Sequence, residues 1–247
     1  MTFTCNICGR PQTIDQDLLE RENASCTRCG SNVRYRAIIH HLSVALFGEP
    51  RNLPDFKGSK SLLGIGFSDW PGFAAPLSKR TGYRNTFLHQ EPAVDLHNVP
   101  PNQRGLYDFA ICSEVLEHVP PPVQLAFHGL ASLLKPNAPL ILTVPYQTEG
   151  GTIEHFPTLH RYTWTSIDGL PVLVNRRADG QYEVFHRFEW HGGIGDTVEM
   201  RMFGIEDLLA NLEHAGFDAA LMPQDHLPSG IFWKHPWSLP IVARKRA

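Results

Sequence analysis

The sequence predicts an α/β domain built on a mostly parallel sheet, preceded by a small cysteine-rich module. Two observations predict this division. Four of the five cysteines stand in two Cys-x-x-Cys pairs within the first thirty residues. From about residue 60, short apolar runs alternate with helical stretches, a pattern typical of parallel strands that helices cover on both faces. The 247 residues are enough for one full domain and an accessory module.

Composition and charge argue against a disordered chain, a generally basic nucleic-acid-binding protein and a membrane-spanning protein. With 42% apolar and 19% charged residues, the chain has the composition of an ordered globular protein. A net charge of -3 does not by itself favour nucleic-acid binding. No apolar run approaches the roughly 18 residues that span a bilayer, and the N-terminus lacks a basic-then-apolar signal pattern. We therefore expect a soluble, cytoplasmic protein that does not bind membranes.

The two cysteine pairs are Cys5 with Cys8 and Cys26 with Cys29, separated by 17 residues. This spacing falls within the range of zinc ribbons, and four thiolates form a closed tetrahedral shell around Zn²⁺. Two disulfides or four free thiols are the alternatives, and both are less favoured in a protein without an export signal. Residues 1–32 are therefore predicted to hold a structural zinc ion that takes no part in catalysis.

Zinc ribbons can also bind nucleic acid, which leaves a second role open for the module. Residues 1–50 contain five arginines and five acidic residues, so no general phosphate-binding surface is predicted. Arg28, Arg34 and Arg36 nevertheless cluster in the sequence and predict either a local basic patch or a solvated face. Nucleic acid is therefore an unlikely partner that the sequence does not exclude.

The remaining elements follow from hydrophobic periodicity and from helix start and stop signals. A helix is expected over 33–47, where Gly48 and Pro50 end it, and residues 33–57 then join the module to the main domain at 58–247. The expected strands are 61–66, 86–89, 107–113, 140–144, 218–222 and 239–244, and two further helices are expected over 123–134 and 203–215. The segment 146–202 fits neither pattern and is rich in His, Gly and aromatic residues. Because it follows a strand's carboxyl end, we expect it to be an insertion that covers the substrate crevice.

Two segments have the character of a ligand site. The first is LLGIGFSD at 62–69, where glycines at a strand's end permit close approach of a ligand. Asp69 stands where a dinucleotide fingerprint needs its third glycine, which argues against a bound pyrophosphate. The second is YDFAICSEVLEHV at 107–119, where polar residues follow a buried strand. In open α/β sheets, ligands bind at that edge.

YDFAICSEVLEHV, followed by a helix and LLKPNAPLILTVPY, resembles the class I S-adenosylmethionine-dependent methyltransferases, in particular the UbiE/UbiG-like subgroup of types 11 and 12. The resemblance is strongest over residues 58–146. It implies a Rossmann-like sheet, mostly parallel with an antiparallel last strand, and S-adenosylmethionine as cofactor. The N-terminal cysteine pairs resemble those of zinc-ribbon methyltransferases.

The resemblance also implies cofactor-binding residues. Gly66 matches the first glycine of the cofactor loop, which runs from Gly64 through Ile65, Gly66 and Phe67 to Ser68. Ser68 replaces the second glycine, and Gly64 replaces an acidic residue that places the cofactor's amino-acid end. Glu91 matches the carboxylate that holds the ribose hydroxyls, and Asp95 matches a residue that contacts the adenine. Ser113 and Glu114 lie beside the methionine moiety.

Three histidines are candidates for a catalytic base, because a hydroxyl or protonated amine acceptor must lose a proton and the histidine pKa is near neutral. They are His118 after the strand expected at 107–113, His155 after the strand expected at 140–144 and His191 near the end of the insertion. Each is equally plausible as a structural residue that bonds loop carbonyls.

Three functions stay open at this stage. The first is O-methylation, or N-methylation, of a small molecule or glycan. The second is methylation of RNA, with the zinc ribbon recognising the substrate. The third is a non-catalytic scaffold, which the departures at Gly64 and Ser68 motivate.

Overall fold

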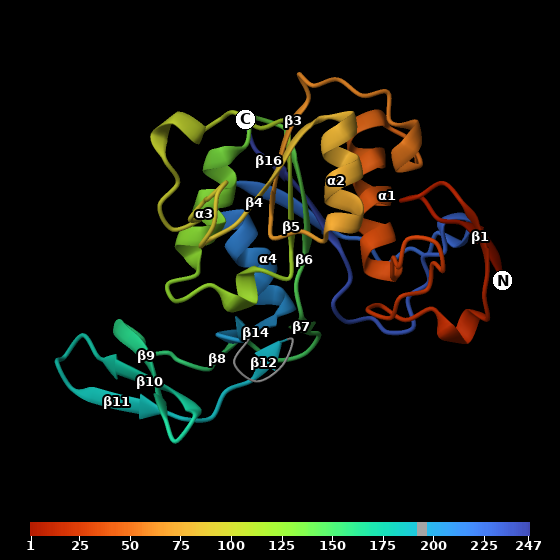
Figure 1. Cartoon of the computed structure of the whole chain (residues 1–247). Helices are drawn as coiled ribbons and strands as arrows, with labels where there is room; N and C mark the ends of the chain where they lie inside the picture. Colours follow the sequence, from red (N-terminus) through yellow and green to blue (C-terminus); the bar gives the residue numbers. More distant parts are fainter. Residues whose placement is uncertain (192–196) are drawn as a thin grey trace.

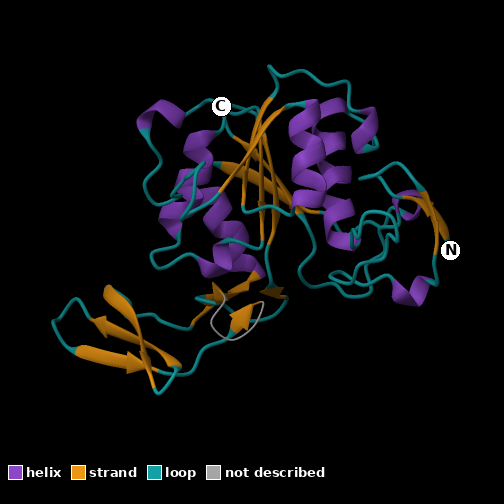
Figure 2. Cartoon of the chain, in the orientation of Figure 1, coloured by secondary structure: helices purple, strands orange, loops and turns teal. Residues whose placement is uncertain are grey.

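The computed structural model of the chain describes residues 1–191 and 197–247. Figure 1 shows a central sheet with α1 (Val33–Phe47) and α2 (Pro71–Arg80) on one face and α3 (Gln124–Leu133) and α4 (Ile205–His214) on the other. The N-terminal module, residues 1–32, lies beyond α1. Residues 146–202 form smaller sheets at the opposite side, as the strands coloured orange in Figure 2 show.

The central sheet has six strands in the order β15-β16-β6-β5-β3-β4. Their bounds are β3 (Leu63–Phe67), β4 (Gly82–Thr86), β5 (Phe109–Ser113), β6 (Pro139–Thr143), β15 (Phe217–Leu221) and β16 (Ile241–Lys245). Strands β4, β3, β5 and β6 are parallel, whereas β16 runs antiparallel to both β6 and β15. The expected fold class, a Rossmann-like methyltransferase sheet with an antiparallel last strand, is confirmed.

The direction in which the chain winds reverses next to β3. From β3 the chain goes outward to β4, and it then returns to the other side of β3 for β5 and β6. The carboxyl ends of β3 and β5 therefore flank a topological switch point, which is where open α/β sheets bind ligands.

The helices follow from local signals. The Asn32 side chain caps the start of α1 by accepting from the Tyr35 N–H at 2.8 Å, and Gly48 ends it with φ 77°, in the left-handed region. This helix has the predicted bounds. The short helix α2 was not expected, because Pro76 lies within its ten residues and interrupts the helical pattern. Proline at its first position, Pro71, favours its start.

Strand β4 begins earlier than the sequence suggests. The apolar residues that predict a strand over 86–89 lie at and beyond its carboxyl end, while the strand itself consists of Gly82-Tyr83-Arg84-Asn85-Thr86. An edge strand needs fewer apolar residues because only part of its surface is covered. The remaining strands lie within two residues of their predicted positions.

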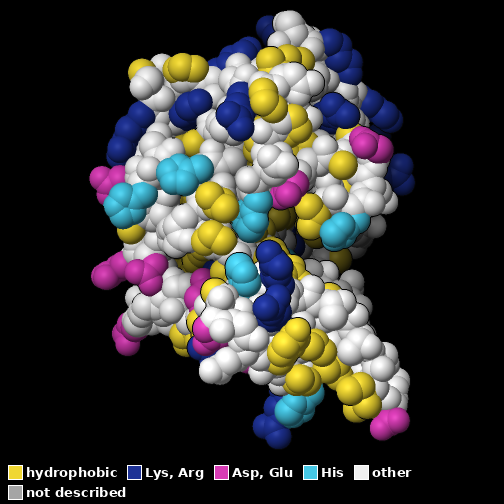
Figure 3. Space-filling view, turned by 90° about the vertical axis from the view of Figure 1, so that its left-hand side faces the viewer, with side chains coloured by type: hydrophobic (Ala, Val, Ile, Leu, Met, Phe, Trp, Pro, Cys, Tyr) yellow, Lys and Arg dark blue, Asp and Glu magenta, His cyan; other side chains and the backbone are white. Residues whose placement is uncertain are grey.

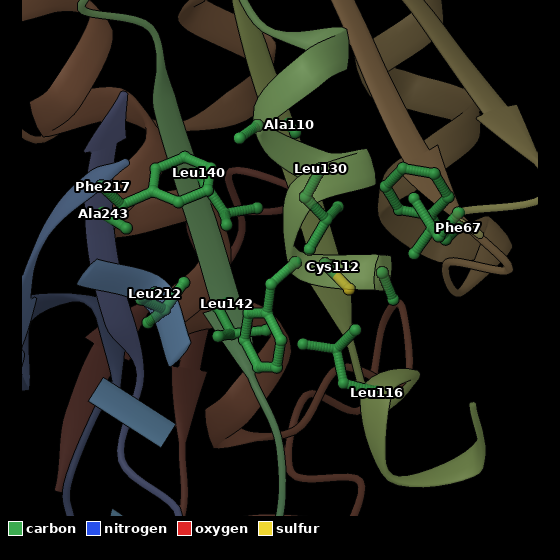
Figure 4. Close-up of a cluster of buried hydrophobic side chains, with 14 of the residues drawn as sticks. Phe67, Ala110, Cys112, Leu116, Leu130, Leu140, Leu142, Leu212, Phe217 and Ala243 are labelled. Carbon is green, nitrogen blue, oxygen red and sulfur yellow. The ribbon is translucent and has the colours of Figure 1, made fainter. Parts of the chain in front are cut away.

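Two cores cover the two faces of the sheet. One packs α3 and α4 against Ala110, Cys112 and Leu142, and Figure 4 shows the Cys112 sulfur enclosed by leucines. The other packs α1 and α2 against Phe109 and Ile111. Cys112 is fully buried, so it has the structural role of a small apolar residue.

The N-terminal module is joined to the main domain by a buried arginine. The module contains the hairpin β1 (Thr2–Thr4) and β2 (Pro11–Thr13) and the short helix η1 (Gln16–Leu18). Arg36, on α1, is fully buried and donates to the carbonyl oxygens of Ser31 at 2.9 Å and Gly230 at 2.8 Å. Gly230 lies in the loop between β15 and β16, after η5 (Leu227–Ser229), so this loop is fixed against the module.

The insertion at 146–202 contains three small sheets. Strand β14 (Arg201–Gly204) pairs with β7 (Tyr146–Gln147) and β8 (Ile153–Glu154), and β12 (Trp190–His191) pairs with β13 (Thr197–Val198). Strands β9 (Arg161–Ile167), β10 (Leu170–Arg176) and β11 (Tyr182–Phe185) form an antiparallel sheet that projects from the main domain. Figure 3 shows hydrophobic side chains gathered on this projecting part. The short helices η2 (Leu53–Asp55), η3 (Pro101–Gln103) and η4 (Leu116–His118) complete the fold.

Candidate functional site

The candidate site is the carboxyl edge of β3 and β5 at the switch point. The first residue beyond each strand has a positive φ, 56° at Ser68 and 53° at Glu114. Such backbone is strained in residues other than glycine and is often found where a site requires a sharp turn. Both residues were singled out from the sequence, and the structure brings them to the same edge through the pairing of β3 with β5.

Two arginines from outside the sheet reach the end of β5. Arg34, in the first turn of α1, donates from Nη1 to Ser113 Oγ at 2.5 Å. Arg21, in the N-terminal module, donates to both carboxylate oxygens of Glu114, at 2.8 and 3.2 Å. Glu22 joins the two, since it bonds Arg34 through two contacts of 2.7 Å and also pairs with Arg21. The module therefore forms part of the site.

This arrangement makes the edge strongly charged but balanced. Burial raises the pKa of Glu114, but the guanidinium groups of Arg21 and Arg34 outweigh burial and lower that pKa below its usual range. Glu114 is therefore ionised, and the edge presents two guanidinium groups and two carboxylates. Guanidinium groups bind carboxylate ligands through paired N–H donors.

A buried carboxyl follows β3. Asp69 is 4% exposed and accepts from the Tyr83 hydroxyl through Oδ2. Burial raises its pKa to about 7, against the opposing influence of Tyr83 and Arg34. Among the described residues, its other oxygen, Oδ1, is buried and has no hydrogen-bond partner. A buried acceptor without a partner is costly, so it is a candidate to receive a ligand's donor.

The glycines of the predicted cofactor loop are required by packing. A Cβ on Gly66 would overlap the Tyr83 hydroxyl and the Asp69 carboxylate, and one on Gly64 would overlap the Phe109 ring. Tyr83 and Phe109 stack with ring centroids 5.9 Å apart. The two glycines thus make room for this aromatic pair and for the Tyr83–Asp69 hydrogen bond. Ile65 and Phe67 are buried on the opposite face, whereas Ser68 is exposed.

Glu91 and Asp95 lie in the loop after β4, and both are exposed. Glu91 accepts from the Ala93 N–H at 3.1 Å, and Asp95 accepts from the His97 N–H at 2.8 Å. Each side chain therefore stabilises its own turn.

Two of the three candidate histidines contact Val198 and Glu199, near the end of the insertion. His118, in η4, has Nδ1 2.8 Å from the carbonyl oxygen of Val198 and Nε2 3.6 Å from Glu117 Oε1. Since a carbonyl only accepts, Nδ1 carries the proton and Nε2 is the basic nitrogen. His155 Nε2 lies 3.5 Å from Glu199 Oε1. His191 ends β12, and its side chain lies outside the described part of the structure.

The four predicted metal ligands come together. Their Sγ atoms all lie within 4.8 Å of one another, and Cys5–Cys29 and Cys8–Cys26 are each 3.7 Å apart. All five cysteines of the chain are unbridged. Four thiolates at the Zn–S distance of 2.3 Å in a tetrahedron would be about 3.8 Å apart, so the geometry fits a zinc ion.

Neither alternative for the arginine cluster, a local basic patch or a solvated face, holds in the structure. Arg34 and Arg36 are 8% and 0% exposed and donate to partners inside the protein, which leaves only Arg28 on the surface. In the sequence, three arginines within nine residues resemble a surface cluster. The start of α1, however, turns Arg34 toward the sheet edge and Arg36 toward the loop between β15 and β16.

Sequence reasoning missed Arg21, Arg34 and Asp69 as members of the site. Arg21 and Arg34 are 93 and 79 residues from their partners Glu114 and Ser113, so no local pattern connects them. Asp69 was noted only as a residue that replaces a glycine.

Comparison with known proteins gives matches among solved structures alone; no family model and no curated protein matches the chain. One match is an amino pentose methyltransferase from Micromonospora echinaspora with S-adenosylmethionine bound. It is 14% identical with a TM-score of 0.47, over 87% of this chain and 92% of that chain. A sugar N-methyltransferase from a Streptoalloteichus species is 10% identical with a TM-score of 0.49, over 90% and 89%. A putative S-adenosylmethionine-dependent methyltransferase from Listeria monocytogenes is 13% identical with a TM-score of 0.48, over 86% and 100%.

Among the described residues, no helix is both long and apolar enough to cross a membrane.

Proposed function

We propose that this chain is an S-adenosylmethionine-dependent methyltransferase of the UbiE/UbiG-like kind, which methylates an oxygen, or a nitrogen, of a small molecule or sugar. The observation that carries the proposal is the charged edge at the switch point. There, in a sheet of methyltransferase topology, Arg34 and Arg21 meet the end of β5 and Asp69 follows β3.

The residues at this edge fit the amino-acid end of the cofactor. Arg34 supplies a guanidinium group for its carboxylate, with Ser113 and Glu114 beside it. Asp69 Oδ1, which has no partner among the described residues, supplies an acceptor for its ammonium group. We propose that Asp69 replaces the acidic residue that the family has at the position of Gly64. Glu91 and Asp95 are proposed to contact the ribose and the adenine.

When bound, S-adenosylmethionine supplies an electrophilic methyl group, so the chain itself has to position the acceptor and remove its proton. His118 is the best-supported base of the three histidines. It lies in η4, four residues beyond Glu114 at the β5 edge. With Nδ1 bonded to the Val198 carbonyl oxygen, its Nε2, which lies 3.6 Å from Glu117 Oε1, is the nitrogen that would accept a proton. His155 and His191 stay proposed as alternative bases on the strength of their positions in the sequence.

The four cysteines are proposed to hold one structural zinc ion. With four thiolates the shell is closed, so the ion has no position for a substrate. Its role is to fold residues 1–32, which present Arg21 and Glu22 to the sheet edge.

A non-catalytic scaffold is a second candidate, because the arginines already bond Ser113, Glu114 and Glu22. A domain that has replaced cofactor contacts with internal ion pairs would have this arrangement. RNA methylation has less support, since two of the three clustered arginines, Arg34 and Arg36, are buried.

Incubation with methyl-labelled S-adenosylmethionine tests the proposal. The protein is mixed with a small-molecule extract or with RNA, and label is counted in each fraction. We expect label in the small-molecule fraction and a large loss with His118→Gln, while His128→Gln, on α3, retains activity. Transfer to RNA alone, or no transfer together with no cofactor binding, would refute the proposal.

A further inference from the structure

A cavity lies outside the candidate site at the sheet edge. It has a volume of about 380 Å³ and lies between residues 19–23 of the N-terminal module and residues 232–237 of the loop between β15 and β16. Small-molecule sites in proteins begin at about this size. Figure 1 shows this loop, in dark blue, crossing to the red N-terminal module.

Arg21 connects this cavity to the candidate cofactor site. It lines the cavity, and its guanidinium group also bonds Glu114 at the end of β5 and the carbonyl oxygen of Ser238 at 3.1 Å. A molecule in the cavity would therefore be separated from the β5 edge by a single side chain.

The cavity walls combine aromatic surface with polar groups of both kinds. Trp237 is 46% exposed and stacks on His235, with ring centroids 5.7 Å apart and an interplanar angle of 18°. Glu20 of the module and Lys234 of the loop pair at 2.6 Å and so join the two sides of the cavity. The flat aromatic surface suits a ring, while the two acidic and two basic side chains among the lining residues leave no net charge to attract a polyanion.

One polar group in the cavity wall lacks a hydrogen-bond acceptor among the described residues. The indole N–H of Trp233 is buried and, among the described residues, has no hydrogen-bond partner, although Trp233 lines the cavity. Buried indole N–H groups usually find an acceptor. A ligand oxygen would provide one.

We propose that this cavity binds the acceptor of methyl transfer, and that the acceptor is an uncharged, hydroxyl-rich ring compound, a sugar. The proposal rests on the methyltransferase function proposed above and adds the place and class of the substrate. The ring's C–H face packs on Trp237, and its hydroxyls bond Trp233, Glu20 and Lys234. Arg21 orients the acceptor toward the β5 edge.

Saturation-transfer NMR without cofactor tests this proposal, with methyl α-D-glucoside as the probe and 4-hydroxybenzoate as an aromatic probe of similar size. We expect a signal from the glucoside. Trp233→Phe keeps the ring but removes the N–H, and should weaken binding by about tenfold. Trp237→Ala should abolish the signal. Trp164→Ala, which alters an exposed tryptophan on β9, serves as the matched control and should change nothing.

No glucoside signal with the wild-type protein, or equal signals in all three variants, would overturn the proposal. Binding of 4-hydroxybenzoate alone would overturn the sugar assignment. A calorimetric titration with S-adenosylmethionine on the same samples keeps the two proposals apart. Failure of cofactor binding with an intact glucoside signal refutes methyl transfer but leaves the sugar site standing.

Discussion

Replacing Arg34 by Met should weaken cofactor binding far more than it destabilises the fold. The methionine side chain keeps much of the apolar stem of Arg34 but removes the guanidinium group. The Arg34 side chain is 10% exposed, and its guanidinium group bonds Ser113 and Glu22. Glu22 is 48% exposed, so water can solvate it once its partner is gone. We therefore expect a loss of about 1 kcal/mol in the free energy of unfolding.

The effect on the cofactor should be larger. A charge-assisted hydrogen bond contributes about 1.5–3 kcal/mol, which corresponds to roughly 10- to 150-fold weaker binding of S-adenosylmethionine. Arg34→Lys keeps the charge without the paired donors and should give an intermediate value. Calorimetric titration measures the affinity, urea unfolding measures the stability, and Arg28→Met, on the exposed surface of the same module, is the control. Equal affinities for Arg34→Met and Arg28→Met would refute the assignment of Arg34 to the cofactor's carboxylate.

Three further outcomes are expected. Gly66→Ala should lower the free energy of unfolding by about 1–3 kcal/mol, because the added Cβ would overlap the Tyr83 hydroxyl. Urea unfolding should show a smaller loss when Tyr83→Phe is also present, and an unchanged loss would contradict this reason. Asp69 binds its proton more tightly when folded, at a pKa of about 7 against 3.8, so stability should fall by roughly 3 kcal/mol as pH rises from 4 to 7. Asp69→Asn should remove that fall, and equal pH profiles would exclude Asp69 as its source. Elemental analysis should find one zinc per chain. The Cys26→Ser variant should lose the zinc and also bind the cofactor more weakly, because Arg21 lies in the module that the metal folds. A zinc-free protein with unchanged stability would contradict this expectation.

The sequence predicted the sheet well because its strands are continuous apolar runs, and their alternation with helices leaves few possible topologies. It predicted the cysteine cluster because four ligands in two short turns form a local pattern. The helix α2 and the true extent of β4 escaped prediction, since neither has a clear apolar period.

The site was only partly predictable, for a physical reason. Ser113 and Glu114 follow from the end of a buried strand, which local sequence marks. Their partners Arg34 and Arg21 meet them only after α1 and the N-terminal module fold onto the sheet. The module was expected only to hold a structural zinc ion. The metal itself fits that role, but the module also supplies charged side chains to the sheet edge.

The edge formed by β3 and β5 is the proposed binding site of S-adenosylmethionine. A crystal structure grown with saturating S-adenosylhomocysteine, the product of methyl transfer, tests it most directly. We predict that the product lies at this edge, with its carboxylate on Arg34 and its ammonium group on Asp69. An empty edge in those crystals, with Arg34 still bonded to Ser113 and Glu22, would exclude this cofactor site and favour the scaffold.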